Sequence, residues 1–193
     1  KLLEDVDFYD PSRIIRDFRT AHDQFLATIN SRSLQGVYFF PFGHAGKSGS
    51  ALTYHYRTAN NIPLAKCKYF TELTTLFEEE SNQEVKLVFI DDFIGTGGQA
   101  IDTWDRLREI PFPRNSEVFL LTLVGFDRAI EEVTRKTNLR IITPRLLSDE
   151  DRIYSPANTS FEENEKQILK EYCDIKCEKI IGPFEFIPIV ECL

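Results

Sequence analysis

Two adjacent aspartates, Asp91 and Asp92, stand between an apolar run and a glycine-rich turn in the stretch KLVFIDDFIGTGGQAIDTW, residues 86–104. Neighbouring carboxylates at the end of a buried strand repel each other and are costly to remove from water. Their presence there indicates a ligand that compensates for this cost. Carboxylate oxygens can accept hydrogen bonds from a sugar diol, and they can hold Mg²⁺ directly or through water. Asp91 and Asp92 are therefore candidate catalytic and metal-binding residues.

The turn GTGG, residues 95–98, has the composition of an anion site. Glycine lets backbone N–H groups approach an anion closely, and a helix that begins near Gly98 adds unpaired amides and the positive end of its dipole. Thr96 offers a hydroxyl to the same anion. The stretch predicts a phosphate at the helix end and ribose hydroxyls over the carboxylates. It does not match the dinucleotide fingerprint GxGxxG, because Ala100 stands where the last glycine is needed.

The elements that would position these residues alternate between strands and helices. This order predicts an α/β fold with a Rossmann-like, mainly parallel sheet and helices on both faces, and ligands in such folds bind beyond the carboxyl ends of the strands. Asp127 is expected to cap the helix that follows it. Strands are predicted at 36–40, 64–70, 85–90, 116–126 and 139–144, and helices at 12–29, 50–61, 99–109 and 127–138. A short helix or loop is expected at 70–84, a loop and then a helix at 148–172, and an edge strand at 184–193.

The bulk composition bounds the class of protein. A chain of 193 residues with 42% hydrophobic residues can bury a sizeable core. Its formal charge of −8 argues against a general nucleic-acid surface, and no apolar run approaches the roughly 20 residues of a membrane span. Cys173 and Cys177 have a spacing that metal sites also use, but the three histidines lie far away in sequence. Free thiols in a reducing cytoplasm are therefore the favoured interpretation.

The stretch 86–104 resembles the signature of the type I phosphoribosyltransferases, which is four apolar strand residues, two acids, two apolar residues and Thr-Thr-Gly-Gly-Thr. Here residues 87–90 fill the strand, Asp91 and Asp92 are the acids, and the central Thr-Gly-Gly of the loop matches. The resemblance implies that the loop binds the 5-phosphate of 5-phosphoribosyl 1-diphosphate and that Mg²⁺ accompanies this substrate. The loop reads Gly95, Thr96, Gly97, Gly98 and Gln99, so that two of the family's threonine hydroxyls are missing.

An earlier turn, PFGHAGKSGSA, lies where that family has its pyrophosphate-binding loop. Lys47 would supply a mobile positive charge to the diphosphate, which makes it a candidate catalytic residue, and His44 would either donate to the same group or remain solvated. A Walker A motif is excluded, because Pro41 stands where its first glycine is required. The candidate binding residues of this loop are Gly43, His44, Gly46, Ser48 and Gly49.

The resemblance covers residues 36 to about 126. Within this range, the chain is similar to divergent phosphoribosyltransferase-like modules of bacterial conflict and anti-phage systems, some of which are encoded beside retrons. We expect the chain to divide into an N-terminal helical segment at 1–35, a phosphoribosyltransferase-like core at 36–144, and a C-terminal loop, helix and edge strand at 145–193. The hood that recognises the nucleophile would come from 1–30, from 145–193 or from another chain, so a protein partner or homo-oligomer stays open. Three functions remain: transfer or hydrolysis of the phosphoribosyl group, favoured by the intact acids; ligand sensing without turnover; and a structural or adaptor role with no ligand. Sensing is favoured by the short span 71–84, which contains EEES where active relatives have a long closing loop.

Overall fold

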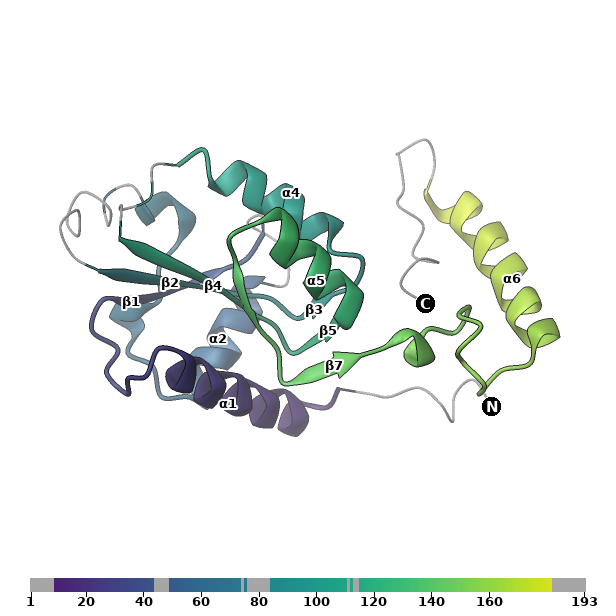
Figure 1. Ribbon diagram of the computed structural model, residues 1–193, viewed down its shortest axis with the longest axis horizontal. Coiled ribbons are helices and arrows are strands. Elements are labelled where there is room, and N and C mark those ends of the chain that lie inside the picture. Colours follow the sequence, from purple (N-terminus) through teal and green to yellow (C-terminus); the bar gives the residue numbers. More distant parts are fainter. Residues whose placement is uncertain are drawn as a thin grey trace.

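A parallel four-stranded sheet in the order β1-β2-β4-β6 forms the centre of the fold (Figure 1). The computed structural model describes residues 9–43, 49–73, 75, 84–110, 112 and 115–181. Every neighbouring pair in this sheet is parallel, and the register places Ile90 beside Leu121. The strands are β1 (Val37–Pro41), β2 (Val85–Ile90), β4 (Ser116–Leu121) and β6 (Arg140–Ile142).

Three of these strands continue, after a break of two residues, into a second parallel sheet. This sheet has three short strands in the order β3-β5-β7. Each follows β2, β4 or β6 directly along the chain, so that the breaks fall at residues 91–92, 122–123 and 143–144. We call these three pairs of residues the strand breaks. The strands of the second sheet are β3 (Phe93–Ile94), β5 (Val124–Phe126) and β7 (Arg145–Leu147).

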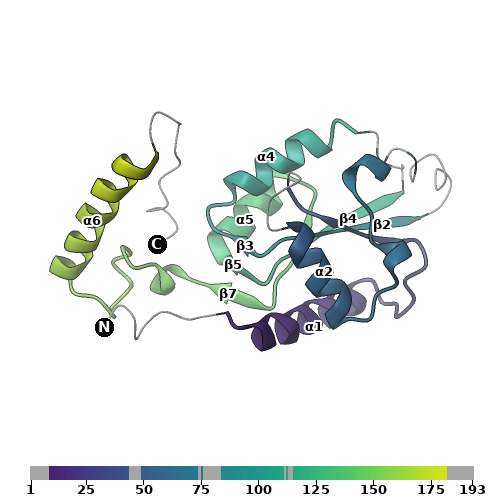
Figure 2. The same cartoon turned by 180° about the vertical axis from the view of Figure 1, so that it is seen from behind.

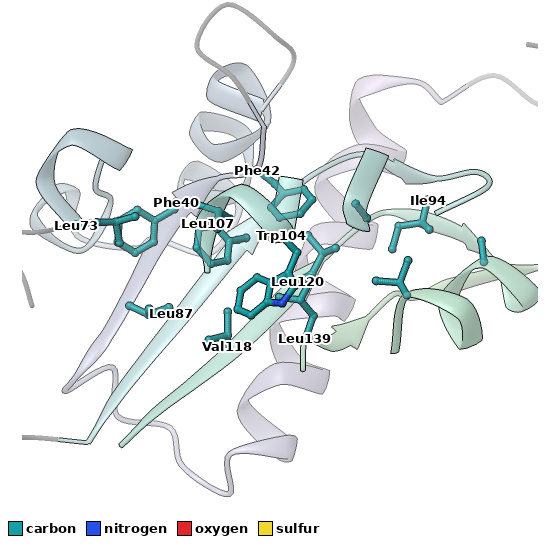
Figure 3. Close-up of a cluster of buried hydrophobic side chains, with 14 of the residues drawn as sticks. Phe40, Phe42, Leu73, Leu87, Ile94, Trp104, Leu107, Val118, Leu120 and Leu139 are labelled. Carbon is teal, nitrogen blue, oxygen red and sulfur yellow. The ribbon is translucent and has the colours of Figure 1, made fainter. Parts of the chain in front are cut away.

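Helices cover both faces of the four-stranded sheet, as the sequence predicts (Figures 1 and 2). Parallel strands covered in this way are apolar on both sides, and alternate residues of β2 enter two different clusters. Phe89 packs with Trp104 and Val133 on one face, and Ile90 packs with Phe18 and Tyr56 on the other. Figure 3 shows the first cluster. The helices are α1 (Pro11–Thr28) and α2 (Gly49–Ala59) on one face, and α4 (Gly98–Leu107) and α5 (Asp127–Lys136) on the other.

The last helix, α6 (Glu163–Ile181), has a buried lysine, Lys166, in its first turn. The Lys166 Nζ donates to the carbonyl oxygens of Ser155 and Asn158, at 2.9 and 2.8 Å, and to Glu163 Oε1 at 2.9 Å. These bonds join the start of α6 to the preceding loop, while Figures 1 and 2 show the helix beyond β7 and away from the sheet. None of the described helices is long and apolar enough to cross a membrane.

Two predicted strands are wrong in extent. Residues 64–70 do not form a strand: two 3₁₀ helices, Leu64–Lys66 and Phe70–Glu72, occupy this segment, and Cys67 alone forms a bridge with Phe39. A 3₁₀ turn follows Pro63, whose carbonyl accepts the Lys66 N–H at 2.9 Å. The predicted strand 116–126 is divided by the break at 122–123.

Two further predictions concern the cap of α5 and an edge strand at the end of the chain. Asp127 is the first residue of α5 rather than its N-cap; Phe126 holds the cap position in an extended conformation, and Asp127 Oδ1 accepts the Arg128 N–H at 2.6 Å. The expected edge strand at 184–193 lies outside the described residues.

Candidate functional site

The three strand breaks lie side by side and place polar residues at the carboxyl edge of the four-stranded sheet. Backbone hydrogen bonds connect them: the Asp91 N–H donates to the Leu121 carbonyl at 3.0 Å, and the Thr122 N–H donates to the Ile142 carbonyl at 3.0 Å. The Asp92 carbonyl accepts the N–H groups of both Leu123 and Val124, at 3.0 and 3.1 Å. This shared carbonyl holds the breaks of β2 and β4 together, so the acids sit on a fixed part of the backbone.

The adjacent acids occupy different environments. Asp91 is 7% exposed, and its Oδ1 accepts the Asp92 N–H at 3.1 Å, whereas Asp92 is exposed. Because Phe89 and Ile90 lie on opposite faces, strand alternation places Asp91 on the α4/α5 face and Asp92 on the α1/α2 face. The two carboxylates therefore leave the backbone in different directions, and a ligand that contacts both has to lie across the edge of the sheet.

The turn between β3 and α4 depends on one glycine. Gly97 is buried and has φ of +84°, and a Cβ atom there would lie 2.8 Å from Val133 Cγ2 and 3.2 Å from the Ala129 carbonyl oxygen. Only glycine satisfies both the left-handed backbone and this contact with α5. A Cβ at Gly98 would meet only the Thr96 hydroxyl, at 3.7 Å. The bend that begins α4 is thus held by the packing of Gly97 on α5.

The amino end of α4 combines a hydroxyl with a helix terminus that has no side-chain cap. Gly97 holds the N-cap position and makes no side-chain hydrogen bond, while the Gly98 N–H lies 3.4 Å from Thr96 Oγ1. Gly95, Thr96 and Gly98 are half-buried and Gln99 is exposed, so this turn is accessible from solvent. Backbone N–H groups at a helix terminus and the helix dipole both favour an anion at this place.

The loop that begins after β1 reaches the same edge. The Phe42 N–H donates to the Ile90 carbonyl at 2.9 Å, next to the acids, and Gly43 follows with φ of +96°. Gly49 is the first residue of α2. The structure therefore brings the beginning of this loop to the region of Asp91 and Asp92. The other candidate residues of the loop lie outside the described residues; they are His44, Gly46, Lys47 and Ser48.

A cavity of about 420 Å³ opens beside Asp92. This volume falls within the range of small-molecule sites. The Tyr9 Oη donates to Asp17 Oδ2 at 2.9 Å on one side of the cavity, and burial raises the pKa of Tyr9 while a hydrogen bond with Arg145 acts in the opposite direction. The lining residues are Tyr9, Ile14, Leu52, Asp92, Phe93, Leu123, Val124, Arg145 and Leu147.

Sequence reasoning did not name the cavity residues that flank the acids. Tyr9 and Arg145 come from the segments 1–30 and 145–193, the two parts of this chain that are expected as sources of a hood, but no motif marks these two side chains. Phe93 had a weak signal, since it directly follows the acids in an apolar position and is 40% exposed. Thr122 had none, because it stands inside an apolar run that reads as one strand.

The described residues do not form a metal cage by themselves. They contain no group of three His, Cys, Asp or Glu side chains that could hold a metal ion. Asp92 at the rim of the cavity and the neighbouring Asp91 fit a Mg²⁺ ion only when a ligand supplies further oxygens, which is the usual way in which Mg²⁺ is held with phosphate substrates.

The comparisons with known proteins give one family and a set of similar solved structures. A family model described as PRTase-CE matches residues 1–186. An orotate phosphoribosyltransferase from Aeropyrum pernix is similar at 15% identity and a TM-score of 0.43, over 72% of this chain and 78% of that one. An adenine phosphoribosyl transferase from Trypanosoma brucei, solved with AMP, pyrophosphate and ribose-5-phosphate, is similar at 16% identity and a TM-score of 0.43, over 84% and 82%. No curated protein matches the chain.

Proposed function

The chain belongs to the PRTase-CE family, a type I phosphoribosyltransferase-like family, and on this premise we propose that it binds 5-phosphoribosyl 1-diphosphate, or a related nucleotide, together with Mg²⁺. One observation carries the proposal: the two acids and the accessible amino end of α4 share one edge of the sheet, joined by the short strand β3. A sugar phosphate presents a diol at one end and an anion at the other. The acids and the turn are therefore complementary to its two ends.

Each part of the site takes one part of this ligand. The backbone of Gly95 to Gln99 binds the 5-phosphate through the amides at the start of α4. Asp91 and Asp92 accept hydrogen bonds from the ribose hydroxyls, and Mg²⁺ held by these carboxylates and the ligand would neutralise charge on the diphosphate. The cavity beside Asp92 takes the group that is attached to, or attacks, C1 of the ribose.

Turnover would require little covalent chemistry from the protein. Pyrophosphate leaves C1, positive charge develops on the ribosyl centre, and a nucleophile attacks from the opposite face. The protein positions the reactants and stabilises the developing charge. Lys47 and the backbone of residues 43–49 steady the departing diphosphate, while Asp91 and Asp92 hold the ribose. A role in bacterial defence is the setting that the sequence resemblance suggests.

The second candidate is a sensing module that binds the same ligand without turnover. The sequence feature that favours it is the short span between Leu73 and β2, which carries a run of glutamates, residues 78–80. The negative charge of this span would repel a diphosphate, whereas the long loop of active relatives covers it. Both candidates use the same binding site, so binding tests the site and product release separates the two functions.

The decisive experiment is calorimetric titration with 5-phosphoribosyl 1-diphosphate and Mg²⁺, followed by an assay for pyrophosphate release with a panel of nucleobases and with water. Saturable, Mg²⁺-dependent binding supports the proposed site. Release of pyrophosphate identifies a transferase or hydrolase, and binding without release identifies the sensing module. Absence of binding by any phosphoribosyl compound overturns the proposal.

Lys47 allows a separate test of the diphosphate end. In Lys47→Ala, the affinity for diphosphate compounds should fall by about ten-fold, because one charge-assisted interaction is lost, while that for ribose 5-phosphate should change little. The same calorimetric titrations measure both. Equal losses for the two ligands would place Lys47 away from the diphosphate.

A further inference from the structure

One polar side chain near the acids is buried without a partner. Thr122, in the break between β4 and β5, has 0% exposure, and its Oγ1 atom makes no hydrogen bond within the described part of the chain. A buried hydroxyl without a partner is uncommon, because its desolvation is not compensated. Valine would fill the same volume without this cost. The contacts within the described part of the chain therefore give no reason for a hydroxyl at this position.

The sheet places Thr122 next to Asp91. Ile90 and Leu121 are register partners, and the hydrogen bond from the Asp91 N–H to the Leu121 carbonyl continues the ladder by one step. The next pair along is then Asp91 and Thr122. Phe89 and Leu120 belong to the cluster under α4 and α5, whereas Ile90 and Leu121 belong to the opposite one, so alternation returns both Asp91 and Thr122 to the α4/α5 face.

We propose that Thr122 is a positioning residue, whose hydroxyl donates to the Asp91 carboxylate when that carboxylate engages the ribose of a bound ligand. The inference rests on the proposed function and adds a residue to its site. A threonine reaches another staggered rotamer by rotation about Cα–Cβ, which exchanges the hydroxyl and the methyl group within nearly the same volume. The unpartnered hydroxyl is then available to fix the orientation of a carboxylate that has little contact with water.

This role and a purely structural one predict different results for Thr122→Val. If the hydroxyl has no function, its removal leaves ligand affinity unchanged and leaves stability equal or higher. If it positions Asp91, stability is again equal or higher, but affinity for ribose-containing ligands falls by about ten-fold, as expected for one lost hydrogen bond to a charged group. Affinity then falls without a loss of stability, which a packing defect does not produce.

The experiment combines thermal unfolding with titration of three probes in the presence of Mg²⁺: 5-phosphoribosyl 1-diphosphate, ribose 5-phosphate and inorganic pyrophosphate. We expect Thr122→Val to melt no lower than the wild type and to bind both ribose compounds about ten-fold more weakly, with pyrophosphate unaffected. Thr122→Ser, which keeps the hydroxyl, should bind all three like the wild type.

Two negative outcomes are distinguishable. Wild-type binding with equal affinity in Thr122→Val overturns the inference alone and leaves the proposed function standing. Failure of the wild type to bind either ribose compound overturns the proposed function and the inference with it. A lower melting temperature in Thr122→Val together with weaker binding of pyrophosphate would assign Thr122 a structural role, which also contradicts the inference.

Discussion

Three chain segments contribute a strand to each of the two sheets of this protein, yet the sheets differ in burial. In the four-stranded sheet, β2 and β4 are buried over almost their whole length and support clusters on both faces. In the three-stranded sheet, no strand is longer than three residues, and the two outer strands are partly exposed: Phe93 is 40% exposed and Leu146 is 63% exposed. The polar residues of the site lie between the two, at the strand breaks.

This difference indicates a division of roles. The four-stranded sheet provides stability, because its apolar side chains are removed from water on both faces. The three-stranded sheet lines the cavity through Phe93, Val124 and Leu147. The strand breaks need to be rigid and polar at once, and they achieve this through backbone hydrogen bonds such as those to the Asp92 carbonyl.

The largest effect is expected from truncating the core of the four-stranded sheet. Phe119 is fully buried, with its ring centroid 5.1 Å from that of Phe25. Phe119→Ala should lower the free energy of unfolding by about 3–5 kcal/mol. The matched control is Leu146→Ala in β7, where the exposed side chain should contribute less than about 0.5 kcal/mol. Urea denaturation measures both; similar losses would show that the two sheets do not differ in the way described.

The second effect concerns the strand break of β2. Neutralising both acids in Asp91→Asn/Asp92→Asn should weaken Mg²⁺-dependent binding of 5-phosphoribosyl 1-diphosphate by about 100-fold or more, since two interactions of a charged group are lost. The fold should remain intact because the volume hardly changes. Calorimetry and far-UV circular dichroism test the two statements, with Asp102→Asn on the exposed side of α4 as the control. Unchanged affinity in the double variant would contradict the site assignment.

The third effect separates two neighbouring glycines of the turn. Gly97→Ala should destabilise the protein by about 1–3 kcal/mol, because the added Cβ meets α5 and the backbone has positive φ. Gly98→Ala should be neutral or slightly stabilising, since a Cβ there lies in open space apart from the Thr96 hydroxyl. Thermal unfolding distinguishes them. Equal melting temperatures would show that the turn is not held by its contact with α5.

The smallest effect is a pH dependence on the α1/α2 face. His22 Nδ1 lies 2.7 Å from Tyr56 Oη, and burial lowers the pKa of His22 below its ordinary value of 6.5. As pH falls, His22 is therefore protonated in the unfolded chain before it is protonated in the folded one. The free energy of unfolding keeps its full value above the unfolded-state pKa of His22 and declines as pH falls through that pKa. In His22→Gln the decline between about pH 7 and pH 5 should be shallower. Urea denaturation at both pH values checks this; an unchanged slope would exclude His22 as its source.

Local sequence patterns were sufficient for the elements that have a continuous period. The strand 85–90 and the helix α1 lie within one residue of where their apolar residues predict them, and the sequence also predicts α4 next to the acids. The stretch 85–90 is fully apolar apart from Lys86 and is followed by two aspartates. The local sequence therefore predicts both the type of this element and the residue at which it ends.

The break at 122–123 could not be predicted, because tertiary hydrogen bonds create it. Thr122 and Leu123 belong to an apolar run with high strand propensity, and only the carbonyl of Asp92, on another segment, interrupts the ladder there. The strand predicted at 64–70 is wrong for a local reason. A 3₁₀ turn begins after Pro63, while the apolar residues that follow have the composition of a strand. The cavity joins Tyr9 to Arg145 across most of the chain, a pairing that no local pattern contains.

The most direct test of the central claim is a crystal structure with ribose 5-phosphate and Mg²⁺. We expect the phosphate at the backbone N–H groups of residues 95–99 and the ribose hydroxyls at Asp91 and Asp92, with the anomeric carbon toward the cavity beside Asp92. A ligand bound elsewhere on the surface, or a phosphate turned away from the amino end of α4, would contradict the account.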